Sequence, residues 1–249
     1  MEAFAGAAIG LLVLISLAVG LRLIALRIRG GGSPELLLGL MLLLTVGIGY
    51  PGLIAVERAS SDWVRPLYVV ANLCVNVGFA MLFVFTWQVF RPGSGWARSF
   101  AVLGVLALLA NLAVRIVDAI TRPELRAPSE MIAQSLTQTA LVVVPYVWTA
   151  WESIRYYDRM RRRVRLDLAD PVVCNRFLLW GLTCLFVIAG VALNSAALAL
   201  RINIFESPSI LFASSATGLA QAVLLLLAFL PPRSYLEWLR TRATHTAHA

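Results

Sequence analysis

The stretch RYYDRMRRRVRLDLADPVVCNRFLLW, from Arg155 to Trp180, separates the fifth and sixth long apolar segments of the chain. Six arginines lie between Arg155 and Arg165, and an Asp170-Pro171 step leads back into apolar sequence. A basic segment between two apolar ones is typical of a cytoplasmic loop in a membrane protein, where arginine and lysine collect. A nucleic-acid-binding segment and a docking site for a signalling protein are the competing interpretations, and the overall composition helps to separate them.

The composition predicts an all-α membrane protein with several crossings. Of the 249 residues 60% are hydrophobic and only 14% are charged, whereas soluble domains carry about 25% charged residues. Apolar runs long enough to cross a bilayer recur along the chain. All 21 basic residues are arginine, and the net charge is +8. In such a chain a basic excess indicates cytoplasmic loops and anionic inner-leaflet lipids rather than nucleic acid.

Missing residue types exclude several function classes. Without a lysine the chain cannot form a retinal Schiff base, so we expect no cofactor of that kind. The two histidines, His245 and His248, lie near the C-terminus and cannot be zinc ligands within a bundle. Cys74, Cys174 and Cys184 lack metal-site spacing, so no metal is expected. No recognised catalytic motif occurs, and an enzyme is not expected.

Seven apolar segments predict a seven-helix transmembrane domain over residues 1–232. Three of them begin with a capping residue followed by proline, at Ser33, Asp170 and Ser207. The first segment precedes its arginines, which favours a membrane helix over a cleaved signal peptide. Residues 233–249 are expected to form a cytoplasmic tail with a short interfacial helix and a disordered end. The predicted helices cover residues 3–24, 34–56, 66–90, 96–119, 130–166, 171–200 and 208–230.

The distribution of arginine predicts the orientation in the membrane. The loops after the first, third and fifth segments and the tail are rich in arginine, whereas the alternate loops at 57–65, 122–130 and 201–206 are nearly balanced in charge. Arginine excess marks the cytoplasmic side. We therefore expect the N-terminus outside and the C-terminus in the cytoplasm.

The fifth helix is expected to continue beyond the membrane into the arginine run. Its basic side chains would contact anionic inner-leaflet lipids, each contributing about 1 kcal/mol, or would dock a cytoplasmic signalling protein. The candidate lipid or partner contacts are Arg155, Arg159, Arg161, Arg162, Arg163, Arg165 and Arg176.

Polar side chains gather in the outer halves of the predicted helices, whereas stretches such as FAMLFVF and VLLLLAFL make the inner halves apolar. Polar groups inside a membrane are expensive and are functional candidates. The pattern predicts an outward-facing polar pocket above a dry plug. The candidate pocket residues are Tyr50, Asn72, Asn76, Asn111, Arg115, Asp118, Gln134, Gln138, Asn194 and Gln221.

Each of these features also has a structural interpretation. Asparagine and glutamine commonly bond one helix to another, and Arg115 either pairs with Asp118 one turn away or faces the pocket and attracts an anion. Pro51 is expected to kink the second helix and Pro145 the fifth. Gly6 and Gly10 form a GxxxG pattern that predicts close helix packing.

Three functions fit this arrangement. The first is a receptor-like or sensor-like bundle that binds a small molecule, a lipid or a protein partner outside and signals through its basic cytoplasmic loop. The second is a small-solute transporter or channel, which usually shows broken helices and internal repeats; no convincing repeat is found. The third is an accessory subunit of a membrane complex.

The segment RRRVRLDLADPVVCNRF resembles the signature of a family of uncharacterised bacterial seven-helix membrane proteins, in which an arginine run leads into L-A-D-P-V-V-x-N-R-F. Members similarly carry an F-R-P turn after the third helix, here Phe90-Arg91-Pro92. The resemblance implies the seven-helix topology and a bacterial source, and hence a place in the bacterial inner membrane. It leaves the function open.

Overall fold

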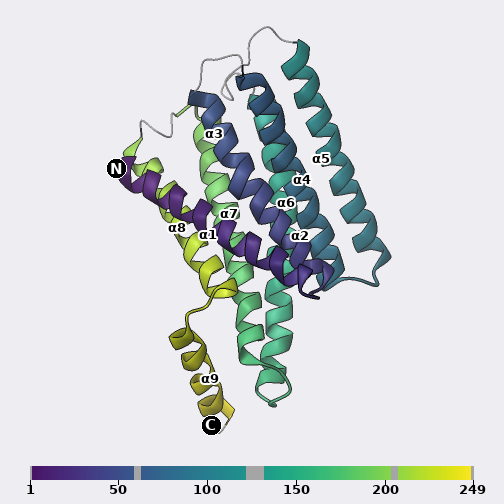
Figure 1. Ribbon diagram of the computed structural model, residues 1–249, viewed down its shortest axis with the longest axis vertical. Coiled ribbons are helices and arrows are strands. Elements are labelled where there is room, and N and C mark those ends of the chain that lie inside the picture. Colours follow the sequence, from purple (N-terminus) through teal and green to yellow (C-terminus); the bar gives the residue numbers. More distant parts are fainter. Residues whose placement is uncertain (1, 59–62, 122–131, 203–206, 248–249) are drawn as a thin grey trace.

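The computed structural model describes residues 2–58, 63–121, 132–202 and 207–247. These residues form helices and no strand (Figure 1), which confirms the all-α prediction for this part of the chain. The predicted outer connections at 59–62, 122–131 and 203–206 lie outside it. The helices are α1 (Glu2–Ile28), α2 (Ser33–Leu42), the π-helix η1 (Leu43–Gly49), α3 (Tyr50–Arg58), α4 (Val64–Phe90), α5 (Gly95–Thr121), α6 (Ile132–Val164), α7 (Pro171–Ala199), α8 (Pro208–Phe229) and α9 (Arg233–Ala247).

Six helical stretches among the described residues are long and apolar enough to cross a membrane. They are Ala3–Ile28, Ser33–Val56, Val64–Phe90, Gly95–Thr121, Pro171–Ala199 and Pro208–Phe229. The second joins α2, η1 and α3 into one continuous helical stretch. The fifth predicted span corresponds to α6, whose glutamines, proline and glutamate lower its hydropathy. The protein is thus a multi-pass, membrane-type bundle, and the number of seven crossings stays a prediction.

Local backbone chemistry sets the turn between α6 and α7. After α6 ends, Asp167 adopts a left-handed conformation with φ 54°. The amide of Leu168 then donates to the carbonyl of Arg163 at 2.9 Å, which closes a Schellman-type end. Asp170 caps α7 by accepting a hydrogen bond from the amide of Val172 at 2.8 Å, as predicted from the Asp-Pro step.

The predicted cap at Ser33 is wrong. Gly32 is the residue that precedes α2, and no side chain caps this end. The Ser33 hydroxyl instead donates to Oε1 of Gln88 on α4 at 3.0 Å. A contact between residues far apart in sequence has therefore replaced the local bond.

The second spanning stretch widens into a π-helix directly before Pro51. Proline lacks an amide hydrogen, and its ring crowds the carbonyl one turn earlier. The wider turns of η1, Leu43–Gly49, accommodate this defect. Thr45 lies fully buried in η1, and a side chain at Gly78 of α4 would collide with its hydroxyl. The π-helix is therefore packed tightly on α4.

Glycine allows close helix packing at a different place from the one predicted. A Cβ atom added to Gly6 or Gly10 would meet nothing within 4 Å, so the predicted close packing there is wrong. A Cβ on Gly20 of α1 would lie 3.0 Å from the carbonyl oxygen of Gly39, and one on Gly39 would lie 2.9 Å from that of Gly20. Helices α1 and α2 thus cross backbone to backbone at this pair.

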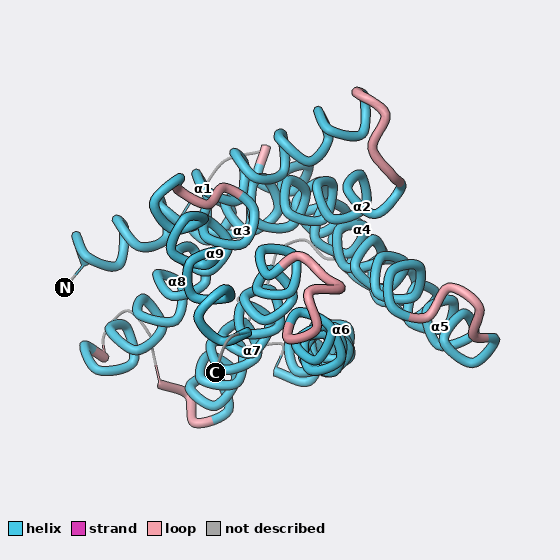
Figure 2. The backbone as a smooth tube through the Cα atoms, turned by 90° about the horizontal axis from the view of Figure 1, so that it is seen from below, coloured by secondary structure: helices cyan, strands magenta, loops and turns pink. Residues whose placement is uncertain are grey.

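Two parts of the molecule lie outside the main helix bundle (Figure 1): helix α5 at one edge, and the α6–α7 hairpin with α9 at one end. Helix α5 lies at one edge, packed mainly on α4 and only lightly on α6 (Figure 2). At the opposite end from the starts of α4 and α6, the α6–α7 hairpin and α9 project beyond the α4–α5 turn (Figure 1). The extension of α6 predicted from the sequence is therefore present, and α9 continues to Ala247, so the disorder expected up to that residue is wrong.

Candidate functional site

A group of polar side chains joins α4, α5 and α6 near the end of the bundle where α4 and α6 begin. We call it the polar cluster; it consists of the side chains of Tyr68, Asn72, Asn76, Asn111, Arg115 and Gln138 together with the backbone carbonyl of Gln134. On α4, the amide of Asn72 donates to the carbonyl of Tyr68, and that of Asn76 to the carbonyl of Asn72, each at 2.9 Å. Asn72 and Asn76 are only 2% and 1% exposed, so both are held within the bundle.

Asn111 connects the three helices of the cluster. Its Nδ2 donates to Oδ1 of Asn76 on α4 at 3.3 Å and, through a short hydrogen bond, to Oε1 of Gln138 on α6. Buried polar side chains without partners are costly, so these bonds explain how an asparagine that is 8% exposed is tolerated here. The sequence-predicted residues Asn76, Asn111 and Gln138 are thus brought together.

Arg115 lies one turn beyond Asn111 on the same face of α5. Its Nη1 donates to the phenol oxygen of Tyr68 at 3.3 Å, and its Nη2 to the backbone carbonyl of Gln134 at 3.4 Å. The guanidinium therefore turns across the helix interface towards α4 and α6. This arrangement corresponds to the alternative in which Arg115 faces the cluster.

The remaining predicted pocket residues lie elsewhere. Asn194 of α7 accepts a hydrogen bond from Ser214 of α8 at 3.2 Å, and Gln221 of α8 donates to the carbonyl of Phe186 at 3.3 Å. These two residues join α7 to α8, and within the described part of the chain neither is hydrogen-bonded to the polar cluster. Tyr50 packs against the hydrophobic core, and Asp118 is half-buried near the end of α5. The predicted set therefore separates into one cluster and several helix contacts.

A layer of apolar and aromatic side chains lies below the polar cluster. Phe79 and Phe83 of α4 are 0% and 1% exposed, and Phe79 meets the ring of Tyr146 on α6 edge-on at 5.8 Å. On α4 the layer extends from Asn76 to Thr86, which is about 15 Å of helix. This is the region that the sequence predicted to be dry.

Below this layer, however, lies a second polar region that the sequence analysis missed. The hydroxyls of Thr86 on α4 and Thr149 on α6 are 2.6 Å apart, and both side chains are fully buried. One turn further, Nε of Arg91 donates to Oε1 of Glu152 at 2.9 Å. The predicted plug is thus confined to the middle of the bundle. A lone carboxylate in the apolar run VPYVWTAWESI was the signal for Glu152.

The Arg91–Glu152 pair is largely enclosed. The Glu152 side chain is 7% exposed and that of Arg91 is 28% exposed. The guanidinium of Arg91 also lies 5.8 Å from the centre of the Trp96 ring, within cation–π range. The pair connects the α4–α5 turn to the middle of α6.

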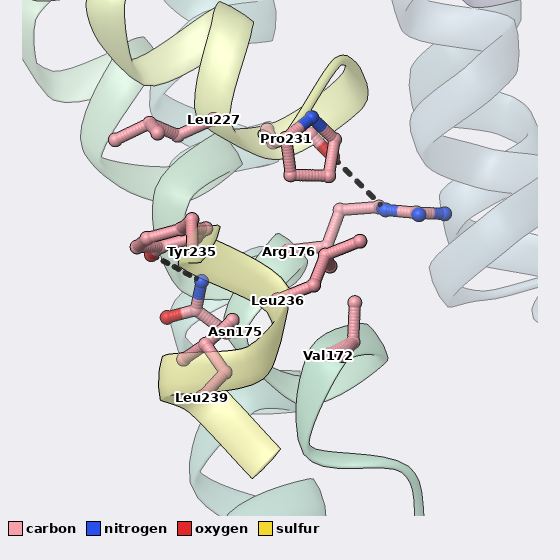
Figure 3. Close-up of a pocket in the computed structure, with 9 residues that line it drawn as sticks. Val172, Asn175, Arg176, Leu227, Pro231, Tyr235, Leu236 and Leu239 are labelled. Carbon is pink, nitrogen blue, oxygen red and sulfur yellow. Dashed lines mark hydrogen bonds between the residues drawn. The ribbon is translucent and has the colours of Figure 1, made fainter. Parts of the chain in front are cut away.

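The residues of the signature after the arginine run each hold a neighbouring element. Asn175 donates through Nδ2 to the phenol oxygen of Tyr235 on α9 at 2.8 Å, and Arg176 donates through Nε to the carbonyl of Ala228 at 3.1 Å (Figure 3). The ring of Phe177 lies 4.6 Å from that of Tyr156 on α6. The signature therefore joins α7 to α6, α8 and α9.

The double proline after α8 explains the bond made by Arg176. Pro231 and Pro232 have no amide hydrogens, so the carbonyls of Leu227 and Ala228 lose their usual helical donors. Arg176 supplies one replacement, and Arg22 of α1 donates through Nη1 to the next carbonyl, that of Phe229, at 2.7 Å. Two arginines thus close the end of α8.

A narrow crevice between α7, α8 and α9 surrounds these contacts (Figure 3). The space between its walls is too narrow for a water molecule. Its apolar walls hold Leu236 and Leu239 of α9. The crevice therefore serves to seat α9 and is not a ligand pocket.

The candidate lipid or partner contacts are exposed. Every one of the arginines named for this role, from Arg155 to Arg176, has an exposed side chain. Arg155 lies 5.9 Å from the centre of the exposed Trp151 ring. Their charge is therefore available to a surface outside the bundle.

Comparison with known proteins adds no constraint on the site: no family model, curated protein or solved structure matches this chain. The functional argument therefore rests on the geometry.

Proposed function

We propose that the chain crosses a bacterial inner membrane seven times, with its N-terminus outside and its C-terminus in the cytoplasm. Six stretches have the length and composition for crossing, and α6 would be the seventh. Three polar residues of α6, Thr149, Glu152 and Ser153, are buried, and a helix face that packs on other helices does not need to be apolar. The arginine-rich α6–α7 hairpin and α9 then project into the cytoplasm.

We further propose that the protein is a receptor-like or sensor-like bundle whose polar cluster binds a ligand from outside. The observation that carries this proposal is the continuity of α6. One unbroken helix contributes Gln134 and Gln138 to the polar cluster, Glu152 to the lower ion pair and the arginine run to the cytoplasmic hairpin. A displacement at the cluster would therefore reach the hairpin through one continuous helix, in which Pro145 lies between the two polar regions.

The apolar layer favours a sensor over a transporter. A transport pathway requires polar groups along its length or helices broken near the membrane midplane. Here the buried rings of Phe79, Phe83 and Tyr146 separate the polar cluster from the lower polar region. A signal can pass such a layer through helix movement, whereas a hydrated solute cannot.

The exposed arginines of the hairpin are proposed as the output surface. They would hold the hairpin against anionic inner-leaflet lipids and release it, or present it to an acidic cytoplasmic protein, when α6 moves. Their exposure and the place of the hairpin beyond the α4–α5 turn (Figure 1) support this role.

Native mass spectrometry of the protein released from nanodiscs of host lipid tests ligand binding. We expect one specific mass to be retained, and to be lost in Asn111→Leu, because this change removes the side chain that joins Asn76 to Gln138. Asn194→Leu is the matched control, since it removes an α7–α8 contact, accepted from Ser214, that lies outside the cluster. Bare protein, or equal retention in both variants, would contradict the proposal and favour an accessory subunit.

A further inference from the structure

Two hydrogen-bonded rungs connect α5 and α6 across the polar cluster. The first joins Asn111 to Gln138, and the second joins Arg115 to the carbonyl of Gln134. Within each helix the two residues are four positions apart, which is about 6 Å along the axis. Because the chain order is opposite in the two helices, the rungs are parallel and enclose one helical turn of each helix.

Each rung carries a buried donor that has no acceptor. Nε of Arg115 and Nε2 of Gln138 are both enclosed and make no hydrogen bond. Nearly all buried polar groups in proteins have a partner, and an unpaired one commonly marks the place of a bound ion or water. Both orphaned groups are donors, so the missing partner is an acceptor.

The charge at this place indicates an anion. The bonded partners of Arg115 are a phenol oxygen and a backbone carbonyl, both uncharged. Among the described side chains of α4, α5 and α6 at this end, the other charged ones are Arg65, at the start of α4, and Asp118, one turn beyond Arg115, and each has an interaction of its own. An oxyanion would bring the negative charge that the guanidinium lacks among its hydrogen-bond partners, together with several acceptor oxygens.

The present bonds of Arg115 can be exchanged readily. Their lengths, 3.3 and 3.4 Å, exceed the usual range for a nitrogen-to-oxygen hydrogen bond. Helix α5 also packs lightly on α6, so long side chains rather than close backbone contact bridge the two helices. The guanidinium can therefore turn to an incoming ligand without breaking the helix packing.

We propose that the ligand of the polar cluster is an oxyanion, a carboxylate or a phosphate, bound between the two rungs by Arg115 and Gln138. This inference rests on the proposed function of the cluster and specifies its ligand class. A free small molecule outside the cell and the phosphate of an outer-leaflet phospholipid both carry this chemistry. Arg115 supplies the charge, and Gln138 selects for an acceptor oxygen.

Thermal unfolding in dodecyl maltoside, a detergent without charge, tests the proposal. Acetate, inorganic phosphate and chloride are compared at constant ionic strength, and phosphatidylglycerol is added in a separate series. We expect acetate or phosphate to raise the melting temperature above that in chloride if the ligand is a free anion, and phosphatidylglycerol alone to do so if it is a lipid.

Variants locate the effect. Arg115→Gln and Gln138→Glu are expected to weaken the apparent affinity about tenfold or more, the loss of one charge-assisted bond. Gln138→Glu keeps the size of the side chain and opposes the anion by its charge. Arg98→Gln is the matched control, because it removes an exposed arginine from the other end of α5. Melting curves without anion show that each variant is folded.

Two outcomes would overturn the assignment: no shift with acetate, phosphate or phosphatidylglycerol, or the same shift in Arg115→Gln as in Arg98→Gln. A retained uncharged molecule that Asn111→Leu loses would contradict the oxyanion and leave the sensor proposal standing. Oxyanion binding that leaves the cytoplasmic hairpin unaffected would support the oxyanion assignment and contradict the sensor proposal.

Discussion

Replacing Arg91 with glutamine is expected to destabilise the protein more than replacing Glu152 with glutamine, although both changes break the same ion pair. The side chain of Glu152 is 7% exposed, whereas that of Arg91 is 28% exposed. Arg91→Gln therefore leaves a carboxylate in the interior without its cation. Glu152→Gln leaves a guanidinium that already reaches solvent, opposite an amide that can still accept a hydrogen bond.

The expected magnitudes follow from this difference. Removing one partner of a buried pair costs about 3–5 kcal/mol, and Arg91→Gln also loses the contact with Trp96, about 0.5–1 kcal/mol. Since Arg91 is partly exposed, we expect about 3 kcal/mol in total for this variant. Glu152→Gln resembles the loss of a surface pair and should cost about 1 kcal/mol. At about 2–4 °C per kcal/mol for a chain of this size, the melting temperature falls about 6–12 °C and about 2–4 °C respectively.

Thermal unfolding of purified protein in detergent measures both values. The double variant should be more stable than Arg91→Gln alone, because it no longer buries a charge, and the difference gives the coupling within the pair. Arg98→Gln controls for the loss of one arginine near the same turn. A larger destabilisation by Glu152→Gln than by Arg91→Gln would refute the reasoning.

Three further predictions concern packing, the seating of α9 and topology. Gly104→Ala should lower stability by about 1–3 kcal/mol in the same assay, because its Cβ would lie 2.5 Å from the buried ring of Phe83; Gly10→Ala, which meets nothing, should be neutral or stabilising. Tyr235→Phe removes the bond from Asn175, costing about 1 kcal/mol, and should speed trypsin cleavage in α9; unchanged cleavage would contradict the seating role of this bond. Green fluorescent protein fused to the C-terminus should fluoresce in a bacterial host if the C-terminus lies in the cytoplasm. A dark fusion with a folded membrane domain would show the opposite orientation.

The helices could be predicted from the sequence because apolar length and capping chemistry are local. Asp170 and Pro171 are adjacent to the helix that they begin, and their roles follow from residue type alone. The glycine prediction failed for the opposite reason. A GxxxG pattern shows where a helix can pack closely, but the crossing point of two helices, here Gly20 and Gly39, depends on the whole bundle.

In the candidate site, too, local residue type could be read from the sequence, whereas the partners of each residue could not. Asn76, Asn111 and Gln138 were identified because polar residues in apolar helices are rare, and the structure places them in one cluster. Asn194 and Gln221 gave the same signal but bond α7 to α8, since residue type does not reveal which neighbour a helix face meets. The pairing of Arg91 with a residue 61 positions later could not be predicted without the fold.

The central claim is that the polar cluster and the α6–α7 hairpin are coupled through α6. Hydrogen–deuterium exchange of residues 155–170 in nanodiscs tests it most directly, by comparing the unmodified protein with Asn111→Leu and with the control Asn194→Leu. From Gln138 to Met160 the helix extends about 33 Å, so no direct contact joins the two places. We predict that Asn111→Leu changes exchange in the hairpin and that Asn194→Leu does not. Identical exchange in all three proteins would contradict the coupling.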